Sequence, residues 1–327
     1  MPPQFDIIIV GSGPSGLATA IEAKRAGLAS VVLEKGSVLD YLRRFPVNMV
    51  WFSTPEMLEI GGIPFVTPTL RPTRVDTLNY YQKVIASCGL DIRPYDAVVS
   101  IRRQGDHGFQ VTTASGAMHT ATYVVVATGY FDHPNRLGVP GEDLAKVSHY
   151  YTEPYPFFQR DVLVVGGRNS AVEAALDLYR HGARVTLVHR GAKLSDGIKY
   201  WVLPDIENRM KANQILGFLS SAVEEITEET VILRTPEGVR EVPNHHVFVL
   251  TGFRPDSDQL RTFGIALDEG TLAPRLEPNS LETSVPGLFV AGSVVAGGDT
   301  NRIFVENGRM HGGEIVRAIM LRNAQKP

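Results

Sequence analysis

The chain of 327 residues predicts about two domains, and its 43% hydrophobic and 20% charged residues exclude a disordered protein. Its 32 Lys and Arg residues nearly balance its 35 Asp and Glu residues, so the charge of the whole chain excludes non-specific binding to nucleic acid or to an anionic membrane. Cys88 is the single cysteine, which excludes an internal disulfide, a CxxC pair and a cysteine-based metal cluster, and we expect no metal site.

The first segment of the chain has the pattern of a strand, a tight turn and a helix. Residues 5–10 are a short apolar run, GSGPSG follows at 11–16, and apolar residues then recur at helical spacing over 17–27. A second apolar run over 30–33 ends at Glu34, 18 residues beyond the last glycine of the motif. A GxGxxG motif between a strand and a helix, with an acid at this distance, predicts a dinucleotide-binding unit.

The residues of this glycine loop each have a physical task in such a unit. Gly11 makes the tight turn, Gly13 lets the main chain approach a diphosphate, and Gly16 lets the helix pack closely on the strand. Glu34 accepts hydrogen bonds from the two hydroxyls of an adenosine ribose. A glycine-rich turn without a ligand would explain the glycines but not Glu34. We therefore assign the whole loop to cofactor binding: Gly11, Ser12, Gly13, Pro14, Ser15 and Gly16.

A second unit of the same kind begins 155 residues later. A strand, the loop GGRNSA, a helix and a further strand are predicted over residues 161–190. Gly166 and Gly167 stand at the turn, and Ala171 stands at the packing position, where the fingerprint accepts alanine.

The two units differ at the position that faces the ribose. The residue 23 positions beyond Gly11 is Glu34, whereas the residue 23 positions beyond Gly166 is His189, followed by Arg190. A guanidinium binds a 2′-phosphate that a carboxylate would repel, so the second cofactor is predicted to be NADPH rather than NADH. Two more basic residues either add to this contact or face solvent: Arg168 and Lys193.

Motifs in the middle and at the end of the chain indicate that the first domain is discontinuous. A β-branched run over 122–127 ends in the tripeptide ATG and leads into a turn-rich stretch. Near the C-terminus, VPGLFVAG predicts a strand before Gly292, and residues 301–321 predict a helix. We expect an α/β protein with two Rossmann-like dinucleotide-binding domains of the three-layer ββα type. The domain of residues 131–251 is inserted between residues 1–130 and 252–327 of the other.

These motifs together resemble the thioredoxin-reductase-like flavoproteins of low molecular weight along nearly the whole chain. The resemblance implies FAD in the first domain, NADPH in the second and a homodimer. Three idiosyncratic stretches, over 52–65, 197–209 and 302–313, resemble the bacillithiol-disulfide reductase branch of that family. The first ten residues lack the pattern of a signal peptide, and no stretch is apolar enough to span a membrane, so we expect a cytoplasmic protein.

The resemblance extends the two cofactor sites beyond the glycine loops. For FAD it adds Lys35, Phe52, Ser53, Val98, Ala127, Thr128, Gly129, Gly292, Arg302 and Ile303 to the first loop and Glu34. For NADPH it implies Gly166, Gly167, Arg168, Asn169, Ser170, Ala171, His189, Arg190, Lys193 and Gly252.

The chain departs from the family at the redox-active cysteines. Tyr150 and Glu153 stand where thioredoxin reductases have their CxxC, and Ser15 stands where the branch often has a cysteine in the glycine loop. Ser293 replaces the acid that binds the ribityl chain in the broader family. Without a protein dithiol, electrons are expected to pass from NADPH to the flavin and directly to an acceptor. Cys88, just before a glycine at the end of a helical pattern, is expected to be a small buried filler.

Reduction of a disulfide also needs a proton donor, for which Tyr150, Glu153 and His311 are candidates. His245 and His246 adjoin in a predicted strand, where neighbouring side chains face opposite ways, so we expect both to be structural.

Three functions stay open. The first is an NADPH-dependent reductase of a low-molecular-weight disulfide such as bacillithiol disulfide. The second is an NADPH reductase of ferredoxin or flavodoxin, which also needs no protein cysteine. The third is a flavoprotein that senses NADPH without catalysis. The FxGxxxH pattern of flavin monooxygenases is absent before His149, because Ala145 replaces its glycine.

Overall fold

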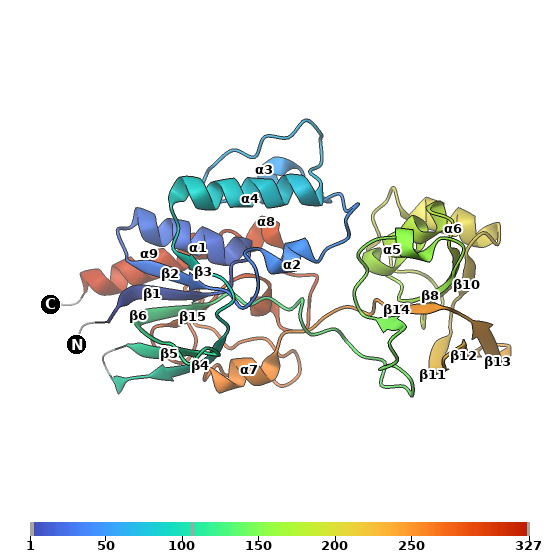
Figure 1. Cartoon of the computed structure of the whole chain (residues 1–327). Coiled ribbons are helices and arrows are strands. Elements are labelled where there is room, and N and C mark those ends of the chain that lie inside the picture. The colour runs from blue at the N-terminus through green and yellow to red at the C-terminus, as the bar shows by residue number, and fades with distance from the viewer. Residues whose placement is uncertain (1–2, 106–107, 326–327) are drawn as a thin grey trace. The chain divides into compact units, whose positions relative to one another are not determined.

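The computed structural model describes residues 3–105 and 108–325. The chain forms two compact units (Figure 1), unit 1 from Met1–Arg43, Val50–His133 and Phe253–Pro327, and unit 2 from Arg44–Met49 and Pro134–Gly252. Residues 44–49 group with unit 2, and the main-chain N–H of Val47 donates to the carbonyl of Thr152 at 2.8 Å.

Unit 1 is built on a seven-stranded sheet in the order β3-β2-β1-β6-β5-β4, with β15 also paired to β6. β1, β2, β3, β15 and the end of β6 are parallel, whereas β4, β5 and the start of β6 form an antiparallel meander. The strands are β1 (Phe5–Val10), β2 (Ser30–Leu33), β3 (Ile92–Arg93), β4 (Val98–Arg103), β5 (Phe109–Thr113), β6 (Met118–Val126) and β15 (Leu288–Val290).

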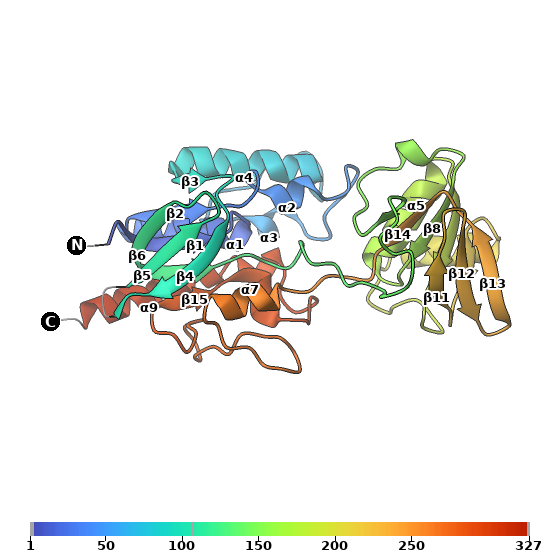
Figure 2. The same cartoon turned by 60° about the horizontal axis from the view of Figure 1, so that its bottom comes forward.

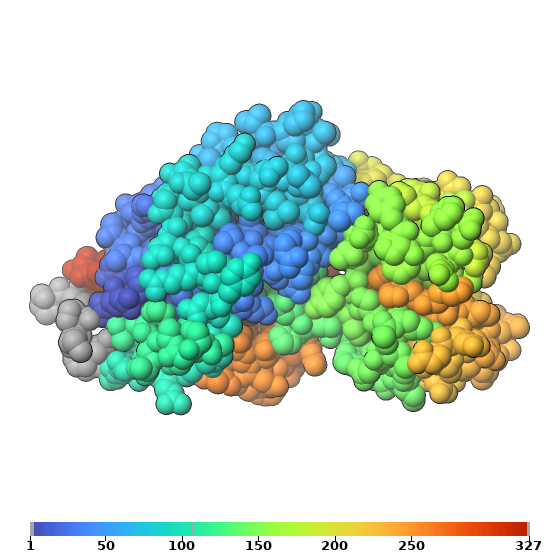
Figure 3. Space-filling view, in the orientation of Figure 1, coloured from blue at the N-terminus to red at the C-terminus, as the bar shows by residue number. Residues whose placement is uncertain are grey.

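Side-chain alternation along β1 explains why unit 1 has three layers. Ile7 and Ile9 pack into a core with side chains of α1 and α9, and Ile8 and Val10 pack into a second core with the meander. Helices α1, α4 and α9 lie on one side of the sheet in Figure 1, and α4 with the chain before it forms the surface there (Figure 3). The helices are α1 (Pro14–Arg25), α2 (Asp40–Arg43), α3 (Pro55–Leu58), α4 (Arg74–Cys88), α7 (Ser257–Thr262), η3 (Gly292–Ala296), α8 (Val305–Gly308) and α9 (His311–Ala324).

Unit 2 repeats this plan around a five-stranded parallel sheet in the order β10-β9-β8-β14-β7. One core joins the sheet to α5 and α6, and another joins its opposite face to the antiparallel sheet β11-β12-β13 (Figure 2). The elements are β7 (Val147–Ser148), η2 (Tyr155–Phe157), β8 (Asp161–Val165), α5 (Asn169–Arg180), β9 (Arg184–Val188), α6 (Leu203–Lys211), β10 (Leu216–Phe218), β11 (Ala222–Ile226), β12 (Thr230–Thr235), β13 (Gly238–Pro243) and β14 (His246–Val249). The expected α/β fold with two three-layer Rossmann-like units is therefore confirmed.

Two local expectations need correction. The helix expected over 301–321 is broken. Asn307 caps the start of a short α8 by accepting from the N–H of Phe304 at 2.8 Å, residues 309–310 form a turn, and α9 begins only at His311. Cys88 ends α4 as expected, but it is only partly buried. No helix of the described residues combines the length and apolar character that a membrane span requires, and no group of three possible metal ligands occurs among them.

His246 is a partly buried residue of unit 2. It packs against Phe157 and Phe248 at ring-centroid distances of 4.9 and 4.5 Å. Burial, and to a smaller extent the charge of Lys146, lowers the pKa of His246 from 6.5 to about 4. The folded protein therefore keeps this ring neutral at pH values where the unfolded chain protonates it.

We predict that unit 2 loses stability as the pH falls from about 6.5 to 4, by roughly 2 kcal/mol for this group after allowance for partial solvation. His246→Phe should make the free energy of unfolding less dependent on pH in that range. Chemical denaturation between pH 7.5 and 4.5 measures this, with His245→Gln, an exposed neighbour, as the control. Equal pH dependence in His246→Phe and the wild type would contradict the prediction.

Candidate functional site

In the glycine loop of unit 1, Gly11 and Gly16 have no room for a side chain, whereas Gly13 borders open space. A Cβ on Gly11 would lie 2.6 Å from the carbonyl oxygen of Ala127, and a Cβ on Gly16 would lie 2.0 Å from that of Gly11. A Cβ on Gly13 would meet only the ring of Tyr41, at 3.9 Å. The first turn of α1 has no side-chain cap. Unpaired amides and open space at Gly13 fit the diphosphate of a dinucleotide such as FAD.

Glu34 fixes this loop from the end of β2. Its Oε2 accepts from both the N–H and the hydroxyl of Ser12 at 2.8 Å, and its Oε1 accepts from the N–H of Gly36 at 2.9 Å. The carboxylate is buried, with 9% of the residue exposed. Three of its roughly four acceptor positions are used, which leaves capacity for a ribose hydroxyl.

The other segments assigned to FAD meet at the same loop. The N–H of Ala127 donates to the carbonyl of Val10 at 2.8 Å. A Cβ on Gly129 would lie 3.5 Å from the hydroxyl of Ser293, and Ile303 lies against Gly308. Val98 is buried two residues beyond Asp96, whose N–H donates to the carbonyl of Glu34 at 2.9 Å.

Ser15 faces glycines of the C-terminal segment. Its hydroxyl would lie 2.8 Å from a Cβ on Gly292 and 3.1 Å from a Cβ on Gly308. The side chain at the position of the branch's cysteine is thus in close contact with two main-chain segments of unit 1.

Four of the residues assigned to FAD share no contact with one another in the structure, and these are Lys35, Phe52, Ser53 and Arg302. Lys35 is paired with Asp132 at 2.6 Å. The ring of Phe52 is exposed, with the guanidinium of Arg71 at 5.9 Å. Ser53 donates to Glu306. Arg302 is exposed. Thr128, in contrast, is partly buried at the loop, with its Cα 3.5 Å from the position of a Cβ on Gly11.

His311 begins α9 beside the glycine loop. Its Nδ1 accepts from the N–H of Gly292 at 3.0 Å, so the neutral ring carries its proton on Nε2. Burial lowers the pKa of His311. The ring is therefore neutral at physiological pH and offers Nε2–H as a hydrogen-bond donor.

The second glycine loop, in unit 2, is equally tight. A Cβ on Gly166 would lie 2.6 Å from both Ala171 and the carbonyl of Leu250, and α5 has no side-chain cap. Asn169 holds the loop over 197–199, donating to the carbonyl of Gly197 at 3.0 Å and accepting from the N–H of Lys199 at 2.9 Å. Arg168, Ser170 and Gly252 are exposed.

The basic residues at the end of β9 differ in whether their side chains are packed, ion-paired or exposed to solvent. The ring of His189 lies against Gly167 and Gly191, and burial and the charge of Arg190 lower the pKa of His189. Lys193 is paired with Asp196 at 2.8 Å. Arg190 is exposed and makes no ion pair within the described part of the chain. Of these three residues, Arg190 is the cation without an ion pair in the described part of the chain, and its binding of a 2′-phosphate stays a prediction.

The three candidate proton donors do not belong to one unit. Tyr150 and Glu153 lie in unit 2 and His311 lies in unit 1. Tyr150 is partly buried, with the guanidinium of Arg44 at 5.6 Å from its ring centroid.

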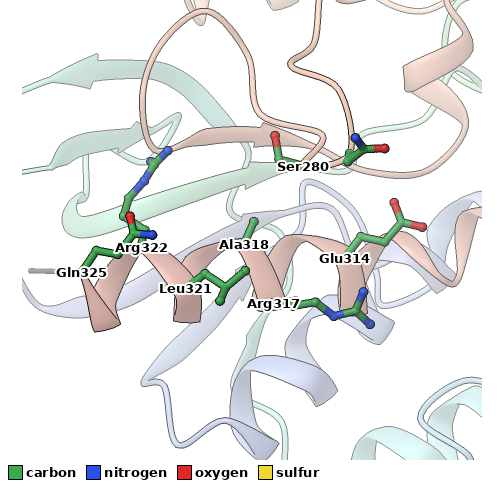
Figure 4. Close-up of a pocket in the computed structure, with 8 residues that line it drawn as sticks. Ser280, Glu314, Arg317, Ala318, Leu321, Arg322 and Gln325 are labelled. Carbon is green, nitrogen blue, oxygen red and sulfur yellow. The ribbon is translucent and has the colours of Figure 1, made fainter.

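A surface hollow of about 320 Å³ lies elsewhere on unit 1 (Figure 4). It is lined by one side of α9, from Glu314 in the first turn past Arg317 and Leu321, and by Asn279 and Ser280. None of the residues assigned to FAD from the sequence lines this hollow.

Comparisons with known proteins agree over nearly the full length. The family model described as pyridine nucleotide-disulphide oxidoreductase matches residues 8–292. Bacilliredoxin reductase Bdr of Bacillus subtilis (strain 168) is 41% identical over 320 residues, covering 98% of each chain. The structure of bacillithiol disulfide reductase Bdr from Bacillus cereus is 39% identical with a TM-score of 0.94, covering 97% of this chain and 99% of that one. A ferredoxin–NADP reductase of Ignicoccus hospitalis is 26% identical over 300 residues, or 88% of this chain and 90% of that protein.

Two of the three glycines of the first loop, Gly13 and Gly16, predict different effects of an added methyl group. Gly16→Ala should destabilise the apoprotein by about 3 kcal/mol, because its Cβ overlaps a main-chain oxygen. Gly13→Ala should leave apoprotein stability within about 0.5 kcal/mol but weaken FAD binding at least tenfold, because its Cβ points into the open space. Thermal unfolding and FAD titration separate the two effects. Wild-type FAD affinity in Gly13→Ala would place the cofactor elsewhere.

Removal of the guanidinium at position 190 should change the cofactor preference. We expect Arg190→Ala to raise KM for NADPH about 10- to 100-fold, the value of charge-assisted hydrogen bonds, with little change in KM for NADH. Lys193→Ala, whose ammonium is already paired, is the matched control and should change either KM less than about threefold. Equal increases for both nucleotides in Arg190→Ala would contradict the assignment.

Proposed function

The chain belongs to the pyridine nucleotide-disulphide oxidoreductase family, and we propose that its substrate is a low-molecular-weight disulfide of the bacillithiol type. It is a thioredoxin-reductase-like NAD(P)H-dependent flavin oxidoreductase that uses FAD and NADPH. The observation that carries the proposal is the 41% identity over 98% of the chain to an enzyme named bacilliredoxin reductase, together with the likeness to a structure named bacillithiol disulfide reductase. Because the chain belongs to a family of oxidoreductases, a flavoprotein that senses NADPH without catalysis has no support.

The proposed reaction consumes one proton for each disulfide. NADPH, one proton and one disulfide give NADP⁺ and two thiols, so the electrons and the cleaved S–S bond balance. Bound FAD supplies the chemistry that takes up a hydride and passes two electrons to the disulfide. The protein supplies binding, alignment and a proton.

Each unit has a separate part in this reaction. In unit 1, the amides around Gly13 and the carboxylate of Glu34 bind and orient the dinucleotide half of FAD. In unit 2, the second glycine loop binds the diphosphate of NADPH, and Arg190 selects its 2′-phosphate.

The acceptor is proposed to meet the flavin without a protein thiol. Cys88 is the only cysteine of the chain, and it ends α4. Ser15 is in close contact with Gly292 and Gly308, and its hydroxyl cannot form a mixed disulfide with the substrate. The electrons are therefore proposed to pass from the flavin directly to the disulfide, without a protein disulfide as an intermediate.

The proton requires a donor near the reacting sulfur. Tyr150 and Glu153 stay proposals for this role. His311 is held neutral, because its Nδ1 accepts from a main-chain N–H and burial lowers its pKa. We therefore assign its Nε2–H to orientation of a bound group rather than to proton transfer.

The alternative acceptor is a small electron-carrier protein. The 26% identity to a ferredoxin–NADP reductase favours it, since that activity also needs no cysteine. One-electron kinetics would distinguish it from disulfide reduction.

We also propose that the enzyme works in the cytoplasm as a homodimer. A cytoplasmic location supplies the NADPH that the reaction consumes. Analytical ultracentrifugation tests the oligomeric state, and a single species at the 35.8 kDa mass of one chain would exclude the dimer.

The first assay is anaerobic NADPH oxidation by the FAD-loaded protein, with bacillithiol disulfide, ferredoxin and flavodoxin in parallel. We expect two thiols released for each NADPH oxidised and no reduction of the carrier proteins. Cys88→Ala should keep the wild-type rate, because no thiol relay exists. An inert disulfide together with fast carrier reduction would establish the alternative, and a slow Cys88→Ala would contradict the direct route.

A further inference from the structure

Glu306 holds a carboxylate oxygen inside unit 1 that lacks a partner. Its Oε1 accepts from the hydroxyl of Ser53. Its Oε2 is buried and has no hydrogen-bond partner among the residues that the structure describes. Leaving a buried acceptor unsatisfied is costly, and more so for a charged group, so such an atom indicates a missing donor.

The groups around Glu306 do not supply that donor. Arg309 directs its guanidinium to main-chain carbonyls, those of Glu56, Glu59 and Glu306 itself. The hydroxyl of Tyr81 donates to the carbonyl of Leu58 at 2.9 Å. Burial raises the pKa of Tyr41 and Tyr81, and the negative charge of Glu306 adds to both shifts.

Glu306 lies on a short helix that contacts the glycine loop. Gly308, two residues further along α8, would place a Cβ 3.1 Å from the hydroxyl of Ser15 and 3.4 Å from the Cα of Gly292. On the other side, the ring of Tyr41 is the one neighbour of the open position at Gly13. Glu306 thus belongs to a helix that contacts the loop expected to bind FAD, and it is not among the residues assigned to that site from the sequence.

We propose that Glu306 Oε2 accepts a hydrogen bond from a hydroxyl or N–H group of FAD bound at this loop. Glu306 is then an FAD-binding residue, and Ser53 is a positioning residue that orients the carboxylate through Oε1. The assignment rests on the proposed location of FAD in unit 1. It explains why a partly buried acid has a buried oxygen, Oε2, without a hydrogen-bond partner in the described part of the chain, while its other oxygen is paired with Ser53.

The substitutions are chosen to distinguish loss of the Glu306 carboxylate from loss of the Ser53 hydroxyl that orients it. Glu306→Leu removes both oxygens and should weaken FAD binding more than tenfold. Glu306→Gln keeps one acceptor of the same shape and should lie between Glu306→Leu and the wild type. Ser53→Ala leaves the carboxylate in place but free to turn, and should weaken binding only about two- to fivefold, within the range of a neutral hydrogen bond.

The measurement is FAD titration of the apoproteins by flavin fluorescence, with the visible absorption spectrum of each loaded protein as a second readout. Glu277→Leu, which replaces an exposed acid of unit 1 between α7 and β15, is the control and should bind FAD as the wild type does. Far-UV circular dichroism and the Kd for NADPH, which binds unit 2, report whether each variant is folded.

The outcomes separate this assignment from the proposed function. Weaker FAD binding in Glu306→Leu, with a changed flavin spectrum and an unchanged Kd for NADPH, supports the hydrogen bond. Wild-type Kd and spectrum in Glu306→Leu would overturn the role of Glu306 alone. If Glu306→Leu fails to fold, wild-type values in Glu306→Gln and Ser53→Ala would overturn it. A wild-type chain that binds no FAD would overturn the cofactor site and this assignment together.

Discussion

Unit 1 depends on the close approach of α1 to the end of β1, which only a residue without a side chain permits at position 16. This approach brings the uncapped first turn of α1 to the carboxyl end of the sheet, where Glu34 then holds Ser12. Unit 2 reaches the same geometry with Ala171 and Gly166. Both sites consist of main-chain amides rather than charged side chains, so selectivity between nucleotides falls to the residue at the end of the next strand.

Much of the fold could be predicted because buried parallel strands are short apolar runs. The limits expected for β1, β2 and β8 coincide with those in the structure, since each run is bounded by a turn or a glycine loop. The short α8 and the later start of α9 could not be predicted. The start of α8 depends on a side-chain cap from Asn307, and α9 begins where Gly312 contacts α1. Helical spacing alone does not contain those interactions.

The glycine loops of the candidate site could be predicted from the sequence, but the packing and ion pairs of the side chains around them could not. Motif spacing indicated Glu34 and Arg190, but it gave no sign that the ring of His189 packs on Gly167 or that Lys193 is already paired. Glu306 escaped because its partner Ser53 is 253 residues away in sequence, and α8 lacks a motif with a known chemical task. Contacts between distant segments of one domain become visible only when the sheet is assembled.

The division of unit 1 into separate stretches of the chain has a consequence for synthesis on the ribosome. β15 pairs with β6, and α9 packs on α1, yet both follow the last residue of unit 2. During translation, unit 2 is complete while the apolar faces of β6 and α1 still await their partners. The nascent chain therefore carries a folded unit 2 while unit 1 still lacks β15 and α9, which lie within its last 75 residues. Until those residues are synthesised, the exposed strand edge and helix face are sites where aggregation can begin.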